Sequence, residues 1–376
     1  MLLKRLTASV PPDLHPLISQ LEAAGIKTTE NLLFTPLPTV LSLIDDPDAQ
    51  YEVEQLIERC LRLTAPVSRS GVEELEEEGS LGKGRWTGFG TAGLDGLVGA
   101  WEGRGVVEIC GPQRVGKSLL ALHIVLKRLL ADPASRCKWL DTDGSFSPAR
   151  ARAVLDHMGF IDHAEVLARL SVAPCYNLDP DLWGALDTIR GEDSGQEGAR
   201  TTILVLDSVT PLLKDLLMGS GSQGHAAMVT MMEEIAELAQ SKGLTVIATN
   251  ATASSRPTNS ASTFTATDVK PALGVGFSYF ADITLMVQST GKLFGEIDEG
   301  ERDRAFSKPG LRGVVEVMKS RVSPTGTWAV FETDGKTLLD VIPAPMDDER
   351  TILMTAGRQV GEARPAYGFL SETLAT

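Results

Sequence analysis

A glycine-rich stretch is the part of this sequence whose residue types and spacing could do chemistry. Residues 110–125 read CGPQRVGKSLLALHIV, with Gly111 followed by four residues and then by Gly116, Lys117 and Ser118. A β-branched run, GVVEIC, precedes it and an amphipathic helical pattern follows, which is the setting of a phosphate-binding loop. Backbone amides of such a loop close around phosphate oxygens at the positive end of the helix, so we predict nucleotide binding here.

The side chains around this loop have distinct predicted roles. Lys117 is expected to bridge the β- and γ-phosphates, and Ser118 to hold Mg²⁺. The apolar run ILVLDS ends in Asp207, whose carboxylate is expected to hold the water shell of the same ion. We therefore predict ATP and Mg²⁺ as cofactors. The nucleotide contacts are assigned to Gly111, Pro112, Gln113, Arg114, Val115, Gly116, Lys117, Ser118 and Leu119.

The elements around the loop alternate between strands and helices, which predicts a mostly parallel sheet covered on both faces. Strands are expected at 105–110, 137–143, 170–175, 201–209 and 244–250, and helices at 116–131, 148–160, 179–191 and 225–243. Later strands lack intervening helices and are expected to extend the sheet antiparallel, with Asp334 and Gly335 as a hairpin turn. These later strands are expected at 282–288, 312–320, 327–335 and 336–342.

Outside this core, the chain has three further predicted regions. Residues 1–63 carry large aliphatic residues at helical spacing and are expected to form a small helical N-terminal domain. That domain is interpreted as a packing or docking module, with a helix-hairpin-helix-like DNA contact as the alternative, since the turn carries only Lys27 as a cation. Residues 64–84 are expected to be a solvated acidic linker, 85–345 the α/β domain, and 346–376 a partly ordered tail.

Composition narrows the class of protein. Of 376 residues, 43% are hydrophobic and 23% charged, as in globular proteins. The sequence has no apolar run of about 18 residues and no signal-peptide pattern, so we expect an intracellular, soluble protein with no membrane partner. The 4 cysteines have no metal-ligand spacing and are expected to be buried apolar residues. The net charge of −15 means that a DNA role needs a local basic patch or a partner.

Three other motif matches are interpreted as coincidences. GFGTAG at 88–93 and GSGSQG at 219–224 both fit a dinucleotide-binding pattern, but neither has the strand and the later carboxylate that such a site needs, so both are predicted to be turns. Asn250-Ala-Thr fits a glycosylation acceptor, which has no meaning without secretion.

Several fragments together resemble one family. TGFGTAGLDGLVGAWEGRGVVEICGPQRVGKS, WLDTDGSFSPAR, ILVLDSVTPLL and GLTVIATN follow one another as in the RecA-superfamily recombinases of eukaryotes. GIKTTENLL, KPALGVGFSYF and MKSRVSPTG are most similar to the D-type recombinase paralogue, the Rad-fifty-one D family. The resemblance covers roughly residues 12–340 and implies a RecA-like ATPase core with a small all-α N-terminal domain.

The resemblance also implies a nuclear protein of homologous recombination. Its implied partners are paralogues of the C and X types, the recombinase itself, and single-stranded DNA within a complex. Recombinases place an aromatic residue and an alanine in the linker to dock on the next subunit. Here LRLTAPV offers Leu63 and Ala65 without a phenylalanine, so the resemblance does not extend to that docking mode.

Two catalytic positions depart from the family pattern. Recombinases carry a glutamate that polarises the attacking water where this chain has Asp143, and a shift of about 1 Å in such a group can reduce the rate on the order of 10²-fold. Recombinases also carry a glutamine that senses the γ-phosphate where Ala251 stands. We therefore expect Lys117 and Asp143 to support, at most, weak DNA-stimulated ATP hydrolysis.

Residues 251–269 occupy the place of the second DNA-binding loop. Arg256 is the only cation there and Phe264 the only aromatic residue, whereas single-strand grooves combine several of each. A solvated, disordered Ser/Thr loop is the favoured interpretation, and ordering on DNA within a complex is the alternative. The insert at 291–310 receives no interpretation.

Three functions follow as hypotheses. The first is a recombination mediator that binds ATP, hydrolyses it weakly, and works by assembly in DNA repair. The second is a P-loop phosphotransferase acting on a small substrate, which would need an arginine-rich lid. The third is a scaffold subunit with a vestigial nucleotide site, although Lys117, Ser118 and Asp207 are all present.

Overall fold

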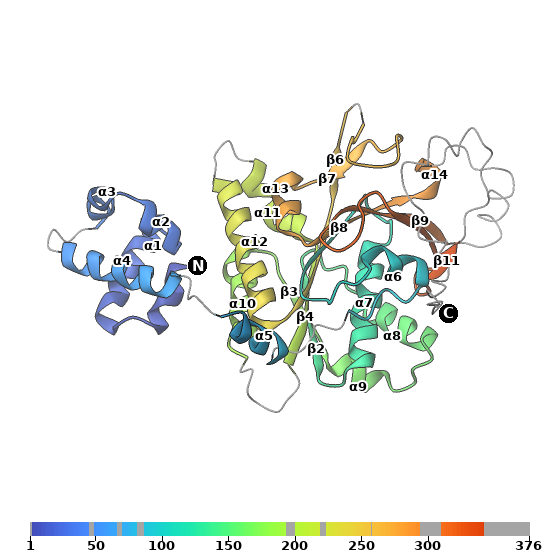
Figure 1. Ribbon diagram of the computed structural model, residues 1–376, viewed down its shortest axis with the longest axis horizontal. Helices are drawn as coiled ribbons and strands as arrows, with labels where there is room; N and C mark the ends of the chain where they lie inside the picture. Colours follow the sequence, from blue (N-terminus) through green and yellow to red (C-terminus); the bar gives the residue numbers. More distant parts are fainter. Residues whose placement is uncertain are drawn as a thin grey trace, which may run out of the picture. The chain divides into compact units, whose positions relative to one another are not determined.

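The chain folds into two compact units, Met1–Ser80 and Leu81–Thr376. In the computed structural model the described residues are 2–44, 49–65, 70–80, 86–192, 200–218, 223–256, 258–293 and 310–341 (Figure 1). The predicted tail at 346–376 and residues 294–309 of the insert lie outside these ranges.

The first unit is built from short helices around an apolar core. Its core includes Leu21, Leu32 and Leu56, each fully buried. Gly25, with φ +96°, follows the first α-helix, and the Thr28 hydroxyl accepts a hydrogen bond of 3.1 Å from the Asn31 amide to cap the next. The helices are η1 (Leu3–Ala8), η2 (Pro12–Leu14), α1 (His15–Ala23), α2 (Thr29–Phe34), α3 (Leu37–Ser42), α4 (Gln50–Thr64) and α5 (Gly71–Ser80).

Helix α5 lies within residues 64–84, the segment that we predicted to be a solvated acidic linker. The Ser70 hydroxyl accepts from the Glu73 amide at 3.2 Å, and the Glu73 carboxylate accepts from the Ser70 amide at 2.6 Å. This reciprocal pair is a capping box, a signal that the sequence carries and that the acidic composition obscured. Val72 and Leu75 of α5 are exposed, so the helix is solvated as expected.

The second unit contains a nine-stranded sheet in the order β11-β10-β9-β8-β1-β5-β4-β2-β3. The strands from β8 to β3 pair in parallel, whereas β9, β10 and β11 are antiparallel, which confirms the predicted sheet. The strands are β1 (Gly105–Cys110), β2 (Ser135–Asp141), β3 (Leu170–Pro174), β4 (Arg200–Asp207), β5 (Thr245–Asn250), β8 (Ile283–Ser289), β9 (Leu311–Ser320), β10 (Trp328–Thr333) and β11 (Leu339–Val341). A separate two-stranded sheet pairs β6 (Thr252–Ser254) with β7 (Val269–Pro271).

Helices cover both faces of the large sheet. Helices α6 to α9 lie on one face and α10 to α13 on the other (Figure 1). Their bounds are α6 (Ala92–Val98), α7 (Lys117–Ala131), α8 (Pro148–His157), α9 (His163–Ala168), η3 (Leu178–Leu182), α10 (Trp183–Arg190), α11 (Val209–Met218), α12 (Gln223–Lys242), α13 (Gly274–Phe280) and α14 (Thr290–Leu293).

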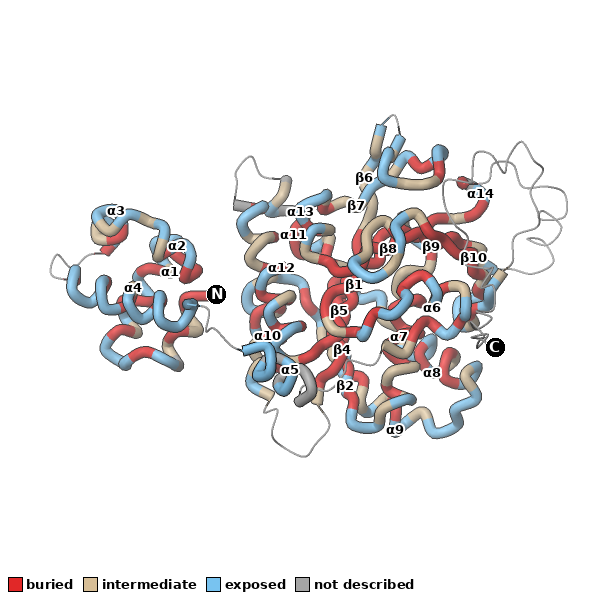
Figure 2. Tube along the Cα trace, viewed as in Figure 1, coloured by how far each residue is buried: buried red, intermediate tan, exposed pale blue. Residues whose placement is uncertain are grey.

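Buried residues follow the central strands, as Figure 2 shows in red. Strands β1 and β5 are buried along their whole length because each has a helix layer on both sides. All four cysteines are buried and free, which confirms that they act as apolar core residues. In the described part of the chain, no helix is long and apolar enough to cross a membrane.

Candidate functional site

The glycine-rich loop joins the central strand β1 to the first turn of α7. Two glycines are needed there for different reasons. A Cβ on Gly111 would lie 2.4 Å from the Val287 carbonyl oxygen of the neighbouring strand, so only glycine fits. Gly116 has φ +97°, a left-handed conformation that disfavours other residues, and it delivers the chain into the helix. The predicted strand, loop and helix therefore come together with free backbone amides at the helix start.

The Lys117 ammonium lies over this loop. It donates hydrogen bonds to the carbonyl oxygens of Gly111 at 2.9 Å and Pro112 at 2.6 Å. Burial lowers the pKa of Lys117, while the nearby Asp207 carboxylate acts in the opposite direction. The ammonium is thus half-buried and fixed beside the loop, where phosphate oxygens would meet its charge.

Asp207 ends the buried strand β4 and lies beside the loop. Its carboxylate accepts a hydrogen bond of 2.5 Å from the Thr249 hydroxyl and another from Ser118. Burial raises the pKa of Asp207, and the carboxylates of Asp143 and Asp141 raise it further. The structure therefore brings together the two predicted metal-binding residues, Ser118 and Asp207, and their oxygen donors fit the preference of Mg²⁺.

Asp143 lies in the loop after strand β2, which ends at Asp141. Its side chain is exposed and accepts a hydrogen bond of 3.1 Å from the Ser145 amide. Asp141, which sequence reasoning left without a role, anchors this loop because its two oxygens accept from the amides of Asp143, Gly144, Ser145 and Phe146. Asp141 therefore fixes the backbone that presents Asp143 near Asp207.

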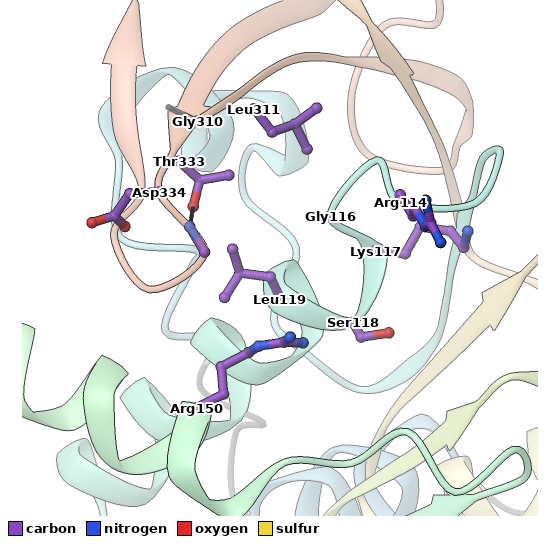
Figure 3. Close-up of a pocket in the computed structure, with 11 residues that line it drawn as sticks. Arg114, Gly116, Lys117, Ser118, Leu119, Arg150, Gly310, Leu311, Thr333 and Asp334 are labelled. Atoms are coloured by element: carbon purple, nitrogen blue, oxygen red, sulfur yellow. Dashed lines mark hydrogen bonds between the residues drawn. The ribbon is translucent and has the colours of Figure 1, made fainter. Parts of the chain in front are cut away.

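A cavity of about 550 Å³ opens beside the loop (Figure 3). Of the nine predicted contact residues, Arg114, Gly116, Lys117, Ser118 and Leu119 line it, whereas Gly111, Pro112, Gln113 and Val115 do not. Sequence reasoning missed the remaining lining residues, Arg150, Gly310, Leu311, Thr333, Asp334 and Gly335.

The missed lining residues come from three places in the sequence: helix α8, the start of β9 with Gly310 and Leu311, and the turn between β10 and β11. Arg150 lies in the first turn of helix α8, where its amide donates to the Ser147 hydroxyl at 3.2 Å, and it was visible in the fragment WLDTDGSFSPAR without a role. Thr333, Asp334 and Gly335 form the turn between β10 and β11. Only the order of strands in the sheet brings this turn to the cavity, so the sequence held no direct signal for it.

One of the two other glycine motifs has a structural explanation. In GFGTAG, the Asp95 carboxylate accepts from the amides of Phe89 at 2.5 Å and Gly90 at 3.3 Å and so forms the turn that begins α6. GSGSQG falls mostly on residues 219–222, outside the described ranges. Asn250 is fully buried and donates to Glu108 at 2.7 Å.

The prediction for residues 251–269 was wrong for the segment 258–269. We favoured a solvated, disordered loop, but this segment, with β6 and β7 at its base, packs against the sheet. Phe264 is 4% exposed and contacts Trp328 edge-on, with ring centroids 5.4 Å apart. Below we call residues 258–269 the strap.

Buried polar partners explain why the strap is ordered. Glu316 of β9 is 1% exposed and accepts from the Ser262 hydroxyl at 2.6 Å and the Thr263 amide at 2.5 Å. Thr267, also buried, accepts from the Gln288 side chain at 3.0 Å. The hydroxyls of Ser262 and Thr267, which suggested solvation, instead pair with the Glu316 and Gln288 side chains that are buried beneath the strap.

Comparisons with known proteins agree with this geometry. A family model described as Rad51 matches residues 87–293, more than half of the chain. The chain is similar to the DNA repair protein rhp51 of Schizosaccharomyces pombe, at 28% identity over 62% of this chain and 63% of that protein. It is also similar to DNA repair protein RAD51 homolog 4 of Bos taurus, at 24% identity over 76% of this chain and 85% of that protein.

A solved structure supports the fold. The crystal structure of the RadB recombinase superposes with a TM-score of 0.51 at 21% sequence identity, covering 68% of this chain and all of that chain. The alignment to the fission yeast protein spans less than two thirds of its length, so shared activity does not follow from it. The match of the family model, together with a parallel sheet whose central strand leads into a phosphate-binding loop, places this chain in the Rad51 family.

Proposed function

We propose that this chain is an ATP-binding recombinase paralogue that acts as a mediator in homologous recombination. The observation that carries the proposal is the convergence of three side chains at the phosphate-binding loop of a Rad51-family fold: Lys117 and Ser118 line the cavity, and Asp207 accepts a hydrogen bond from Ser118. An ammonium, a hydroxyl and a carboxylate at a helix N-terminus suit a nucleoside triphosphate with Mg²⁺, which supplies charge neutralisation between phosphates when bound.

Hydrolysis is proposed to be weak. Asp143 is the residue available to polarise water, and it is one methylene shorter than the family's glutamate. Its side chain is exposed and accepts a hydrogen bond from the Ser145 amide of its own loop. Ala251 follows β5 and has no polar side chain to contact a γ-phosphate. ATP would therefore act chiefly as a bound ligand that supports assembly.

The names of the relatives support a proposal about assembly and location. The curated relatives are named DNA repair proteins, and RAD51 homolog 4 matches over most of both chains. On this basis we propose paralogues of the C and X types, and the recombinase itself, as partners, with single-stranded DNA contacted within the complex, in the nucleus. The net charge of −15 supports DNA contact through a complex rather than by this chain alone.

The test is a measurement of ATP retention and turnover by the purified chain with Mg²⁺, with and without single-stranded DNA. Retention with slow, DNA-stimulated turnover supports the mediator. Rapid turnover that depends on a small acceptor and not on DNA would instead indicate a phosphotransferase. Absence of retention would indicate a scaffold with a vestigial site, and would overturn the proposal.

A further inference from the structure

The cavity beside the phosphate-binding loop has two chemically different ends. One end carries the cations Lys117 and Arg114 together with the N-terminus of α7. The other end is the β10–β11 turn, which carries the Asp334 carboxylate. In Figure 3 the turn residues lie on one side of Leu119 and the loop residues on the other. A triphosphate is attracted to the cations and free amides of the first end, so the nucleoside end of a nucleotide bound there lies toward Leu119 and the turn.

The turn precedes β11, a short strand at the edge of the sheet that pairs with a neighbouring strand on one side only. Strand β11 has three residues and is the last strand of the sheet. The turn is ordered internally, because Asp334 accepts from the amides of Lys336 at 3.1 Å and Thr337 at 2.8 Å. These local bonds fix the shape of the turn but not its position over the cavity, which needs contacts to other elements.

One such contact comes from the phosphate-binding helix itself. His123 of α7 is 3% exposed, and its Nε2 lies 3.1 Å from the Lys336 carbonyl oxygen. A carbonyl can only accept, so Nε2 carries the proton and donates. Burial lowers the pKa of His123 to about 4, with His157 and Lys127 adding to the effect, so the imidazole is neutral near pH 7.

A second contact holds the far end of the hairpin. The Asp340 carboxylate of β11 accepts from the Gly93 amide at the start of α6, at 3.1 and 3.2 Å. His123 is therefore the anchor nearer to the cavity, and it joins the turn to the same helix that begins with Lys117 and Ser118. An apolar residue would fill the space of His123 but would leave the Lys336 carbonyl without this donor.

We propose that His123 is a positioning residue, which holds the β10–β11 turn as the nucleoside-side wall of the nucleotide site at a fixed distance from the phosphate-binding loop. The inference rests on the proposed function, since it concerns the same site. It assigns selectivity for a nucleoside triphosphate over a bare polyphosphate to the hairpin. The hydrogen bond from His123 to the Lys336 carbonyl sets the spacing of the two walls together with the contact between Asp340 and Gly93.

The test compares Mg-ATP with Mg-tripolyphosphate as ligands of the full chain. His123→Phe keeps a ring and removes the donor, so we expect ATP affinity to fall about two- to tenfold, the range for one hydrogen bond, with tripolyphosphate affinity unchanged. His123→Gln keeps an N–H donor and should restore ATP affinity. Leu129→Val, in the last turn of the same helix and buried away from the cavity, is the control and should change neither affinity.

Hydrogen exchange of the amides at 333–337 gives a second readout without any ligand. His123→Phe should speed exchange there, and His123→Gln should not. If the Phe variant does not fold, His123→Leu removes the same donor with less volume. Unchanged ATP affinity and exchange in the variant, or equal loss of both ligands, would overturn the inference alone. A wild-type chain that retains tripolyphosphate but not ATP overturns it as well, whereas one that retains neither overturns the proposed function first.

Discussion

The phosphate-binding loop and the strap, two segments rich in small residues, differ in how their chemistry is specified. The loop depends on its own backbone: Gly111 is dictated by a close approach to Val287 and Gly116 by its φ of +97°. The strap depends on partners elsewhere, since Glu316 and Trp328 hold it to the sheet. A residue type that the local backbone requires can be recognised as a pattern in the sequence. A residue that depends on a partner elsewhere in the fold leaves no such pattern.

The two segments also differ in whether their side chains are accessible to a ligand or buried in the fold. Lys117 and Arg114 lie at the cavity with charged groups accessible to a ligand, whereas Phe264 of the strap is 4% exposed. Residues 251–269 occupy the place of the family's second DNA-binding loop, where we favoured a solvated loop and kept ordering on DNA as the alternative. The Phe264 ring is buried against Trp328 and is therefore not exposed to stack on a base. Substitutions in the strap should therefore affect folding, and substitutions in the loop should affect ligand binding.

The largest expected effect is from Phe264→Ala. Deleting a buried phenylalanine typically lowers the free energy of unfolding by about 3–5 kcal/mol, and the contact with Trp328 would be lost. Denaturant unfolding measures the change. Val275→Ala, at an 85% exposed position, is the control and should leave the free energy unchanged. Equal stability of Phe264→Ala and wild type would mean that the strap is a free loop after all.

Next in size is Lys117→Ala. Removing one partner of a partly buried charge interaction costs about 2–5 kcal/mol, so ATP retention should fall at least thirtyfold while thermal stability changes little. Filter binding with labelled ATP and Mg²⁺ measures the loss. Lys127→Ala removes the same charge from the same helix, away from the cavity, and should retain ATP. If the Lys117→Ala variant retains ATP as well as wild type, the Lys117 ammonium does not contribute to the nucleotide site.

Asp143→Glu separates nucleotide binding from nucleotide hydrolysis. Lengthening the carboxylate by one methylene should raise steady-state ATP turnover by up to about 10²-fold, with ATP affinity little changed. Asp143→Asn, which keeps the length and removes the charge, should give no increase. If turnover of the Glu variant equals that of wild type, the short side chain is not what limits hydrolysis.

The smallest expected effect is from Glu316→Gln, with a sign that depends on pH. Burial raises the pKa of Glu316, so the folded state keeps a proton where the unfolded chain has lost it. The stability that Glu316 contributes therefore falls as pH rises from its ordinary pKa toward the raised one. Glutamine does not titrate, so the cost of the substitution, about 1 kcal/mol, should shrink over that interval.

Thermal melting of both proteins across the acid range measures this effect. Glu76→Gln, which changes an exposed carboxyl of α5, provides the reference and should show no such trend. A cost that grows with rising pH would contradict the assignment of a buried, proton-retaining Glu316.

Sequence by itself determined the order and type of most core elements. Strand β1, helix α7 and strand β4 lie within about two residues of their predicted ends because hydrophobic period and length decide them locally. Lys117, Ser118 and Asp207 could be assigned for the same reason, since each sits at the end of such an element. Helix α5 was also within reach through its capping box at Ser70 and Glu73.

Tertiary structure alone decided the rest. The strap is ordered by Glu316, fifty-odd residues away in sequence, and His123 meets the Lys336 carbonyl across 213 positions. Neither pairing has a period or a spacing that a single sequence displays. The second wall of the cavity exists because β10 and β11 add to the sheet edge beside the loop, and strand order depends on the energy of the whole sheet rather than on any one segment.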